Sequence, residues 1–94
     1  MTHDEAATRL QELNGWTLDG DAIRKQFVFK GFPDAVAFVS RLVPHAETAD
    51  HHPDITINYK RVTLTYTTHS AGGLTPLDFD GARMADRVAA EEAV

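Results

Sequence analysis

The chain has no cysteine, and this absence excludes several kinds of chemistry together. Disulfides, thiolate nucleophiles and cysteine-ligated metal sites all require a thiol. A chain without disulfides is typical of the cytoplasm, where thiols stay reduced, so we expect a cytoplasmic location.

Long apolar runs and basic charge are also scarce. No apolar run approaches the ~20 residues of a membrane-spanning helix, and the first ten residues, MTHDEAATRL, are acidic and polar, unlike a signal peptide. Nine Lys and Arg residues against fourteen Asp and Glu give a net charge of −5, which argues against binding to nucleic acid phosphates. We therefore expect neither a membrane nor a nucleic acid as partner.

The 94 residues are enough for a single domain, expected over 1–94, with an ordinary globular share of hydrophobic residues at 43%. A domain of this size has little spare stability. An open sheet also leaves edges that must be paired or capped. We therefore expect a homo-oligomer, either a dimer or a tetramer.

Helical periodicity appears first near the N-terminus and then, more strongly, after Pro33. Thr2 can cap a first helix that Asn14-Gly15 would end. Pro44 lies inside the second helix and should kink it or end it early, with helix persisting or resuming over 47–49. The apolar positions of this second helix recur at helical spacing: Phe32, Ala35, Val36, Val39, Leu42, Val43 and Ala46.

Strands are predicted in two hairpins. The first joins 16–18 to 22–29 through the turn residues at 19–21. The second joins 55–59 to 62–67, two runs in which apolar residues alternate with polar ones, with Lys60-Arg61 between them. Tyr59 and Tyr66 belong to these runs and are expected to pack on the sheet.

A third helix is predicted to begin at Thr75-Pro76-Leu77-Asp78, where a threonine cap precedes a proline and an acid. Its buried face should comprise Leu77, Ala85, Val88 and Ala89. The order is therefore α-β-β-α-β-β-α. Because hairpins with one apolar face need cover on that face only, this order predicts an α+β fold: a four-stranded antiparallel sheet with the helices packed on one face.

Two adjacent histidines, His51 and His52, lie in the segment ADHHPDI, between the second helix and the third strand. Neighbouring side chains point in different directions on a strand or a helix, so this spacing does not suit a pair of metal ligands, and no metal site is expected. A solvated corner is the plain alternative. However, Pro53 restricts the backbone of His52 and holds the pair in place.

The second hairpin predicts that further chemical groups lie near this histidine pair. If its strands pair across 60–61, residue 52 lies opposite about 69, so His69 should reach the same end of the sheet. Asp78 follows the loop after His69. Because imidazole titrates near neutrality, three histidines beside a carboxylate favour acid–base catalysis.

The segment ETADHHPDITINYKRVTLTYTTHSAGGLTPLD resembles the signature of the pterin-4a-carbinolamine dehydratases. That signature contains an acid four residues before His-His-Pro, an aromatic residue, a histidine at the end of the next strand and an aspartate nine residues later. The corresponding residues here are Glu47, His51-His52-Pro53, Tyr59, His69 and Asp78. The first hairpin, GWTLDGDAIRKQFVFKGF, is also similar and has its tryptophan, Trp16, in place. The chain departs from some members at Ile55, where they carry tryptophan.

The resemblance implies dehydration of 4a-hydroxytetrahydropterin to quinonoid dihydropterin, which recycles the pterin cofactor of aromatic amino acid hydroxylases. It implies that His51, His52 and His69 are catalytic and that no metal or other cofactor is needed. Asp78 would orient an imidazole or cap the helix, or both, and Glu47 is either a second orienting group or a solvated residue. Trp16 either borders the pterin or belongs to the core.

Two other functions stay open at this point. Relatives of the family in animals also act as dimerisation partners of a homeodomain transcription factor, which would use a helical surface and not the histidines. A pterin-binding module in another pathway is the third possibility. The physiological pterin, the partner hydroxylase and the assignment of acid and base to particular histidines do not follow from the sequence.

Overall fold

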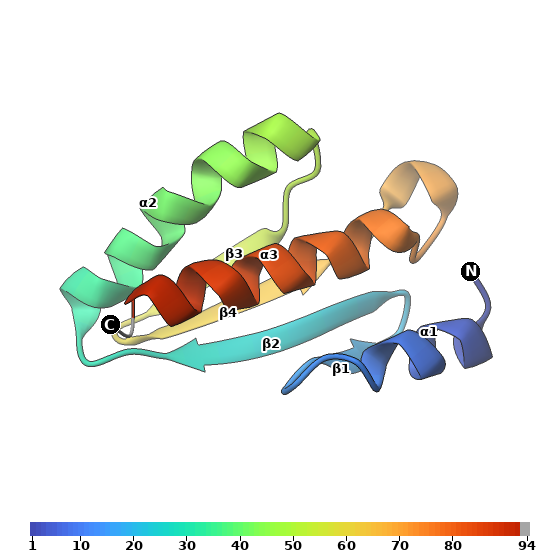
Figure 1. Cartoon of the computed structure of the whole chain (residues 1–94), viewed down its shortest axis with the longest axis horizontal. Helices are drawn as coiled ribbons and strands as arrows, with labels where there is room; N and C mark the ends of the chain where they lie inside the picture. The colour runs from blue at the N-terminus through green and yellow to red at the C-terminus, as the bar shows by residue number, and fades with distance from the viewer. Residues whose placement is uncertain (93–94) are drawn as a thin grey trace.

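The computed structural model describes residues 1–92. In chain order, the elements are α1 (His3–Leu10), β1 (Thr17–Asp19), β2 (Ala22–Val28), α2 (Phe32–Ala49), β3 (Asp54–Asn58), β4 (Arg61–Tyr66), the 3-10 turn η1 (His69–Ala71) and α3 (Pro76–Glu92). One sheet has the strand order β1-β2-β4-β3, with every neighbouring pair antiparallel. Helices α2 and α3 cover one face of this sheet, so the predicted fold and element order are confirmed (Figure 1). None of the helices in the described part of the chain is long and apolar enough to cross a membrane.

The core lies between the covered face of the sheet and the two long helices. Its largest fully buried side chains are Tyr66, Phe38, Phe79, Ile23, Leu42, Leu64, Val62 and Val88. The predicted burial of Ala85 and Val88 is confirmed, but Leu77 is 45% exposed. Phe79, two residues further along, turns inward instead, because residues two apart on a helix lie on different faces.

The helix boundaries follow local capping with two differences from the prediction. Thr2 and Glu5 form a complete capping box at the start of α1, as the cap at Thr2 predicted. The helix ends at Leu10, so the predicted end at Asn14-Gly15 is several residues too late. Helix α2 continues past Pro44 to Ala49 and does not end early.

The second hairpin turns one residue earlier than predicted. Asn58 pairs with Arg61, so the turn is made by Tyr59 and Lys60, and Tyr59 takes a left-handed backbone with φ 54°. This turn leaves the Tyr59 side chain 66% exposed, so the prediction that it packs on the sheet is wrong. Continued beyond Asp54–Thr65, the same register sets His51 beside Thr68, whereas the predicted register set residue 52 opposite 69.

Candidate active site

The structure joins His51 to Asp78. The Nε2 atom of His51 lies 2.6 Å from Oδ1 of Asp78, and the two side chains are 11% and 0% exposed. His51 follows α2, whereas Asp78 belongs to the first turn of α3. A buried carboxylate needs hydrogen-bond donors to offset its loss of hydration, and the His51 imidazole is one such donor for Asp78.

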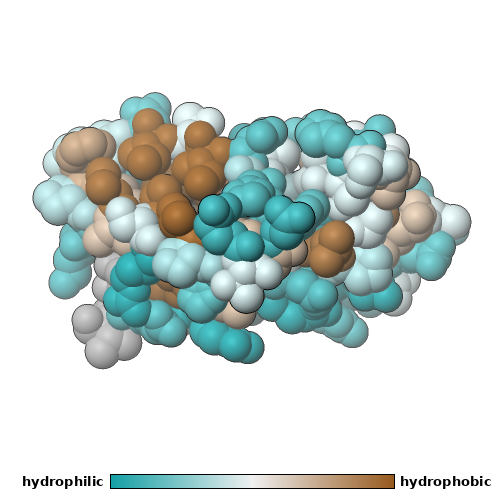
Figure 2. Space-filling view, turned by 90° about the horizontal axis from the view of Figure 1, so that it is seen from above, coloured by the Kyte–Doolittle hydropathy of each residue, from teal (hydrophilic) through white to brown (hydrophobic). Residues whose placement is uncertain are grey.

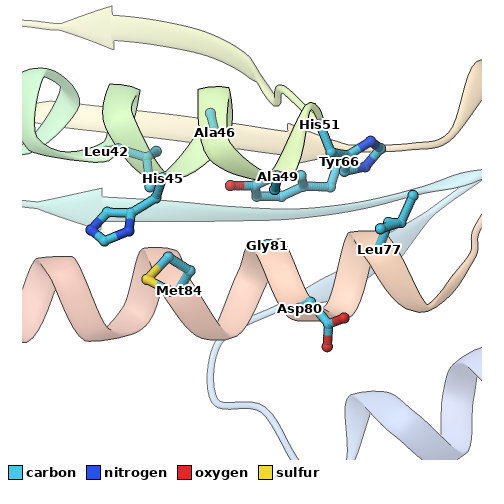
Figure 3. A pocket seen from close by; sticks show the side chains of 10 residues that line it. All are labelled: Leu42, His45, Ala46, Ala49, His51, Tyr66, Leu77, Asp80, Gly81 and Met84. Atoms are coloured by element: carbon cyan, nitrogen blue, oxygen red, sulfur yellow. The ribbon is translucent and has the colours of Figure 1, made fainter.

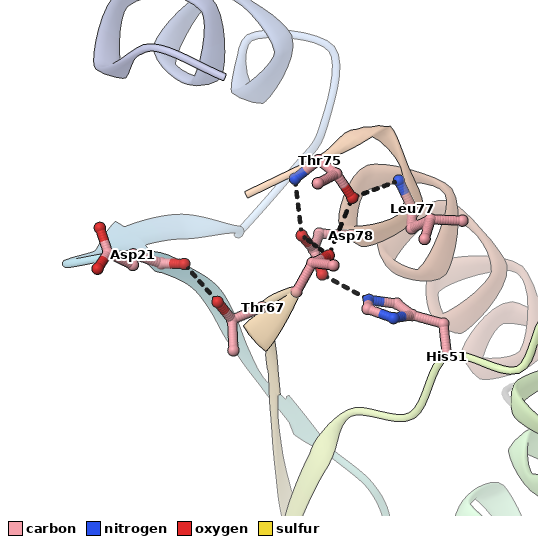
Figure 4. A network of polar contacts seen from close by, with 7 residues as sticks. Asp21, His51, Thr67, Thr75, Leu77 and Asp78 are labelled. Atoms are coloured by element: carbon pink, nitrogen blue, oxygen red, sulfur yellow. Dashed lines mark hydrogen bonds and ion pairs between the residues drawn. The ribbon is translucent and has the colours of Figure 1, made fainter. Parts of the chain in front are cut away.

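Asp78 receives two further hydrogen bonds (Figure 4). Its Oδ2 accepts one from the Thr68 hydroxyl at 2.8 Å and one from the Thr75 backbone N–H at 2.9 Å. The second is half of a capping box, since Thr75 is the helix cap and Asp78 lies three residues later. The predicted capping role of Asp78 is therefore present together with its contact to His51.

The hydroxyl directions around Asp78 form one consistent chain. The Leu77 N–H donates to Thr75 Oγ1 at 3.3 Å, and the Thr75 and Thr68 hydroxyl oxygens are 2.9 Å apart. Because the single hydroxyl hydrogen of Thr68 is donated to Asp78, the Thr75 hydroxyl must be the donor in its contact with the Thr68 hydroxyl. The Asp78 carboxylate accepts from Thr68 and from Thr75, and because an ionised carboxylate can only accept, the His51 Nε2 atom that contacts its other oxygen is assigned the hydrogen. Sequence reasoning did not identify Thr68, although it is the residue before His69.

His52 points elsewhere and contacts Glu47. Its Nε2 atom pairs with the Glu47 Oε2 atom, and the two side chains are 53% and 68% exposed. Glu47 belongs to the last turn of α2, and Pro53, which is buried, fixes the corner that follows. The two adjacent histidines thus each have a carboxylate partner: the pair of His51 and Asp78 is buried, and the pair of His52 and Glu47 is exposed to solvent.

His69 is exposed and begins η1, past the end of β4. It lines a hollow together with Asp21, Thr67 and Gly73, whereas His51 lines a different cavity. The two-residue difference in register agrees with this, because the pairing continued past Asp54–Thr65 sets Thr68, and not His69, opposite His51. Across residues 1–92, no three His, Asp or Glu side chains are grouped so that they could hold a metal ion.

The cavity that contains His51 lies between α2 and α3 (Figure 3). Its volume is about 220 Å³. Tyr66 of β4 also lines it, with its ring stacked on His51 at a centroid distance of 6.0 Å and an interplanar angle of 22°. Burial, together with the charges of Asp78 and Asp86, raises the pKa of the Tyr66 hydroxyl far above its usual range.

Trp16 lies in the core and is 5% exposed. Its ring contacts Phe27 and Tyr66, and its Nε1–H donates to both Asp86 carboxylate oxygens at 3.1 Å. Lys25 completes this group with an ion pair to Asp86 at 2.8 Å. Trp16 therefore contacts Tyr66, which lines the cavity, but Trp16 itself is not among the residues of the cavity wall. A direct contact between Trp16 and the substrate stays a prediction.

Comparison with known proteins assigns this arrangement to a family. Residues 1–88 match the family model described as pterin 4 alpha carbinolamine dehydratase. A protein of Roseiflexus sp. (strain RS-1), which carries a provisional name as such a dehydratase, is 51% identical over 88 residues, covering 94% of this chain and 95% of that protein.

Two solved structures have the same fold. A protein of Brucella melitensis, described as a transcriptional coactivator/pterin dehydratase, aligns with a TM-score of 0.90 and 40% identity over 95% of this chain and 97% of its own. A pterin dehydratase-like protein, described as a RuBisCO assembly factor in the alpha-carboxysome, aligns with a TM-score of 0.64 and 21% identity, covering 79% of this chain and 86% of its own. The second likeness concerns the fold alone.

Proposed function

Because the chain belongs to the pterin 4 alpha carbinolamine dehydratase family, we propose that it removes water from 4a-hydroxytetrahydropterin to give quinonoid dihydropterin. In this role it recycles the pterin cofactor of aromatic amino acid hydroxylases. The observation that carries the proposal is the buried pair of His51 and Asp78, because it holds one imidazole in a defined orientation beside a cavity.

The reaction needs one proton removed and one delivered. The N5–H proton of the substrate leaves, a C4a–N5 double bond forms, and the C4a–O bond breaks as the hydroxyl accepts a proton and departs as water. In neutral His51, Nε2 carries the hydrogen donated to Asp78, which leaves a lone pair on Nδ1. His51 is therefore suited to be the base, and Asp78 stabilises the imidazolium that forms.

His52 is the candidate acid, because it is the neighbour of the proposed base His51 and its Nε2 atom pairs with the Glu47 carboxylate at the solvent-exposed corner. His69 is the proposed group that holds or protonates the leaving hydroxyl, on the strength of its place in the family signature. General acid–base catalysis of this kind contributes roughly 10²–10⁴-fold.

The test is dehydration of enzymatically generated 4a-hydroxytetrahydropterin, with the uncatalysed rate subtracted. We expect wild type to accelerate the reaction and His51→Ala to lower kcat by roughly 10²-fold. His3→Ala is the matched control, because His3 is an exposed residue at the start of α1. Wild-type protein that leaves the uncatalysed rate unchanged, or a folded His51→Ala variant with full turnover, contradicts the proposal.

The outer surface supports assembly of several copies of the chain. Three exposed residues of α2 share one side of the helix: Phe32, Val36 and Val43. Strand β3 is an edge strand with every residue exposed, and its Ile55 and Ile57 side chains face the helix side but are only partly covered. Figure 2 shows apolar residues gathered on the face viewed from above. A homo-oligomer that covers these residues is part of the proposal.

A further inference from the structure

The backbone at the end of α2 fixes where the His51 side chain begins. The N–H of Asp50 donates to the Glu47 carbonyl at 3.2 Å. The N–H of His51 donates to the Ala46 carbonyl at 3.1 Å. These two bonds make a Schellman motif, in which the residue before the last donor takes a left-handed backbone. That residue is Asp50, with φ 50° and ψ 41°. His51 is therefore held by its backbone N–H as well as by the contact of its Nε2 atom with Asp78.

Aspartate is an unusual residue for this position. Among residues 1–92, six have a positive φ, and four of these are glycine. Glycine and, less often, asparagine occupy the left-handed position of a Schellman motif, because a Cβ atom makes this backbone unfavourable. A carboxylate is also unfavourable at the negative end of a helix dipole, and residues 46–49, the last turn of α2, include no basic residue to offset it. Neither the backbone nor the charge of the helix end explains Asp50.

The corner that begins at Asp50 sends two adjacent histidines in different directions. His51 turns inward to Asp78, as Figure 4 shows, whereas His52 is exposed. Pro53, which is buried, restricts the backbone of His52 from the other side. A glycine at position 50 would allow many more conformations at this corner, and a residue with a Cβ atom narrows them. The histidine pair is thus held between one left-handed residue and one proline.

From this geometry we infer that Asp50 is a positioning residue of the site: its left-handed backbone directs the His51 imidazole toward Asp78. The inference rests on the proposed function for the chemistry of His51. The role belongs to the backbone conformation of Asp50 and not to its charge, because within residues 1–92 its exposed side chain makes no hydrogen bond or ion pair. Asparagine also tolerates a left-handed backbone and should therefore replace Asp50, whereas valine should not.

The test compares Asp50→Val with Asp50→Asn and with a control at a second left-handed position. A β-branched residue strongly disfavours this backbone, so valine at position 50 should move the corner. Tyr59→Val is the matched control, because Tyr59 is the other non-glycine residue with a positive φ among the described residues and lies at the far end of β3 from His51. Asp50→Ala provides the same comparison if the valine variant does not fold.

Two properties are measured in each variant. The first is the downfield NMR resonance of the His51 Nε2–H proton, which the contact with Asp78 protects and which is identified by its absence in His51→Ala. The second is the pair of constants kcat and KM for dehydration, with urea unfolding as the measure of stability. The resonance reports the direction of the imidazole whether or not the protein turns over substrate.

We expect Asp50→Val to lose the His51 resonance and to lower kcat by about 10- to 100-fold with KM changed less, because a displacement of about 1 Å at a catalytic group can cost this much. Asp50→Asn should keep both properties, and Tyr59→Val should lose stability while keeping both. The inference is overturned by an Asp50→Asn variant as impaired as Asp50→Val, by an Asp50→Val variant with unchanged resonance and kcat, or by a Tyr59→Val variant that also loses the resonance. A wild type that does not accelerate dehydration, but whose His51 resonance is lost in Asp50→Val alone, overturns the proposed function and preserves the positioning role.

Discussion

His51 and Asp78 are 27 positions apart in the sequence, yet the Nε2 atom of one lies 2.6 Å from the Oδ1 atom of the other. The contact links the end of α2 to the start of α3, the two helices that form the walls of the cavity. A single buried carboxylate thereby caps one helix and orients the imidazole that follows the other. Asp78 therefore contributes both to the stability of α3 and to the orientation of His51, so its substitution should change stability and turnover to different degrees.

Asp78→Asn should lower kcat by more than it raises KM. The amide retains one acceptor oxygen but adds N–H donors where three donors already converge, so His51 would lose its defined tautomer. We expect a fall in kcat of roughly 10²-fold or more. Asp34→Asn is the matched control, because Asp34 also lies in the first turn of a helix but far along the chain from the histidines. Equal kcat values for the two variants contradict the orienting role.

Thr68→Val tests the second layer of support. Valine has the shape of threonine but leaves the Asp78 Oδ2 atom without its 2.8 Å donor, which should cost about 1–3 kcal/mol in the free energy of unfolding and reduce kcat several-fold. Thr65→Val, on the strand β4 that precedes Thr68 and with its side chain on the open face of the sheet, should leave both quantities nearly unchanged. Urea unfolding and the dehydration assay measure the two effects. A Thr68→Val protein as stable and active as the control would show that the hydroxyl is dispensable.

The sequence predicted those parts of the fold and site that depend on local rules. The cap at Thr75 with Asp78 three residues later is such a rule, and the structure contains it. The hairpin turn was displaced because Tyr59 accepts a left-handed backbone, which turn statistics favour for glycine and asparagine. Helical spacing also identified the apolar side of α2 without showing that Val36 and Val43 lie outside the core while Phe38 lies within it.

The missed residues depend on contacts between distant elements. Thr68 bonds Asp78 only because the chain that follows β4 passes beside the start of α3. Tyr66 can lie against α3 only because Gly81 has no side chain to meet its ring. A glycine inside a helical pattern does signal a close approach, but the approaching group cannot be read from the helix alone.

The pairing of Tyr66 with Gly81 predicts strong coupling in a double-mutant cycle. Gly81→Ala alone should lower the free energy of unfolding by about 1–3 kcal/mol, because the added methyl group meets the Tyr66 ring. In a Tyr66→Leu background the same change should be neutral or stabilising by up to about 1 kcal/mol, since alanine is the better helix former. Urea unfolding followed by circular dichroism gives the four values. Equal costs of Gly81→Ala in both backgrounds would refute the steric explanation.

Stability at alkaline pH should depend on Tyr66. Burial raises the pKa of its hydroxyl in the folded protein above the unfolded value of about 10. The unfolded chain alone then ionises as the pH rises past 10, so the stability present below that pH is lost at about 1.4 kcal/mol per pH unit. Tyr66→Phe should remove this part of the pH dependence between about pH 9 and 11. Tyr59→Phe, at an exposed position, should retain it, and identical slopes for Tyr66→Phe and wild type would contradict the assignment.

The edge strand β3 provides the test of assembly. Ile57 pairs with the buried Val62 and points to the same side of the sheet, yet remains 38% exposed because no strand lies beyond β3. If a second copy covers this edge, Ile57→Lys should shift the protein toward the monomer in sedimentation at micromolar concentration, because a desolvated lysine opposes association. Val28→Lys is the matched control, since Val28 is a 58% exposed apolar residue on the interior strand β2. A wild-type protein that is monomeric at these concentrations would contradict the proposed assembly. An oligomer that tolerates Ile57→Lys as well as Val28→Lys would place the contact between copies away from the β3 edge.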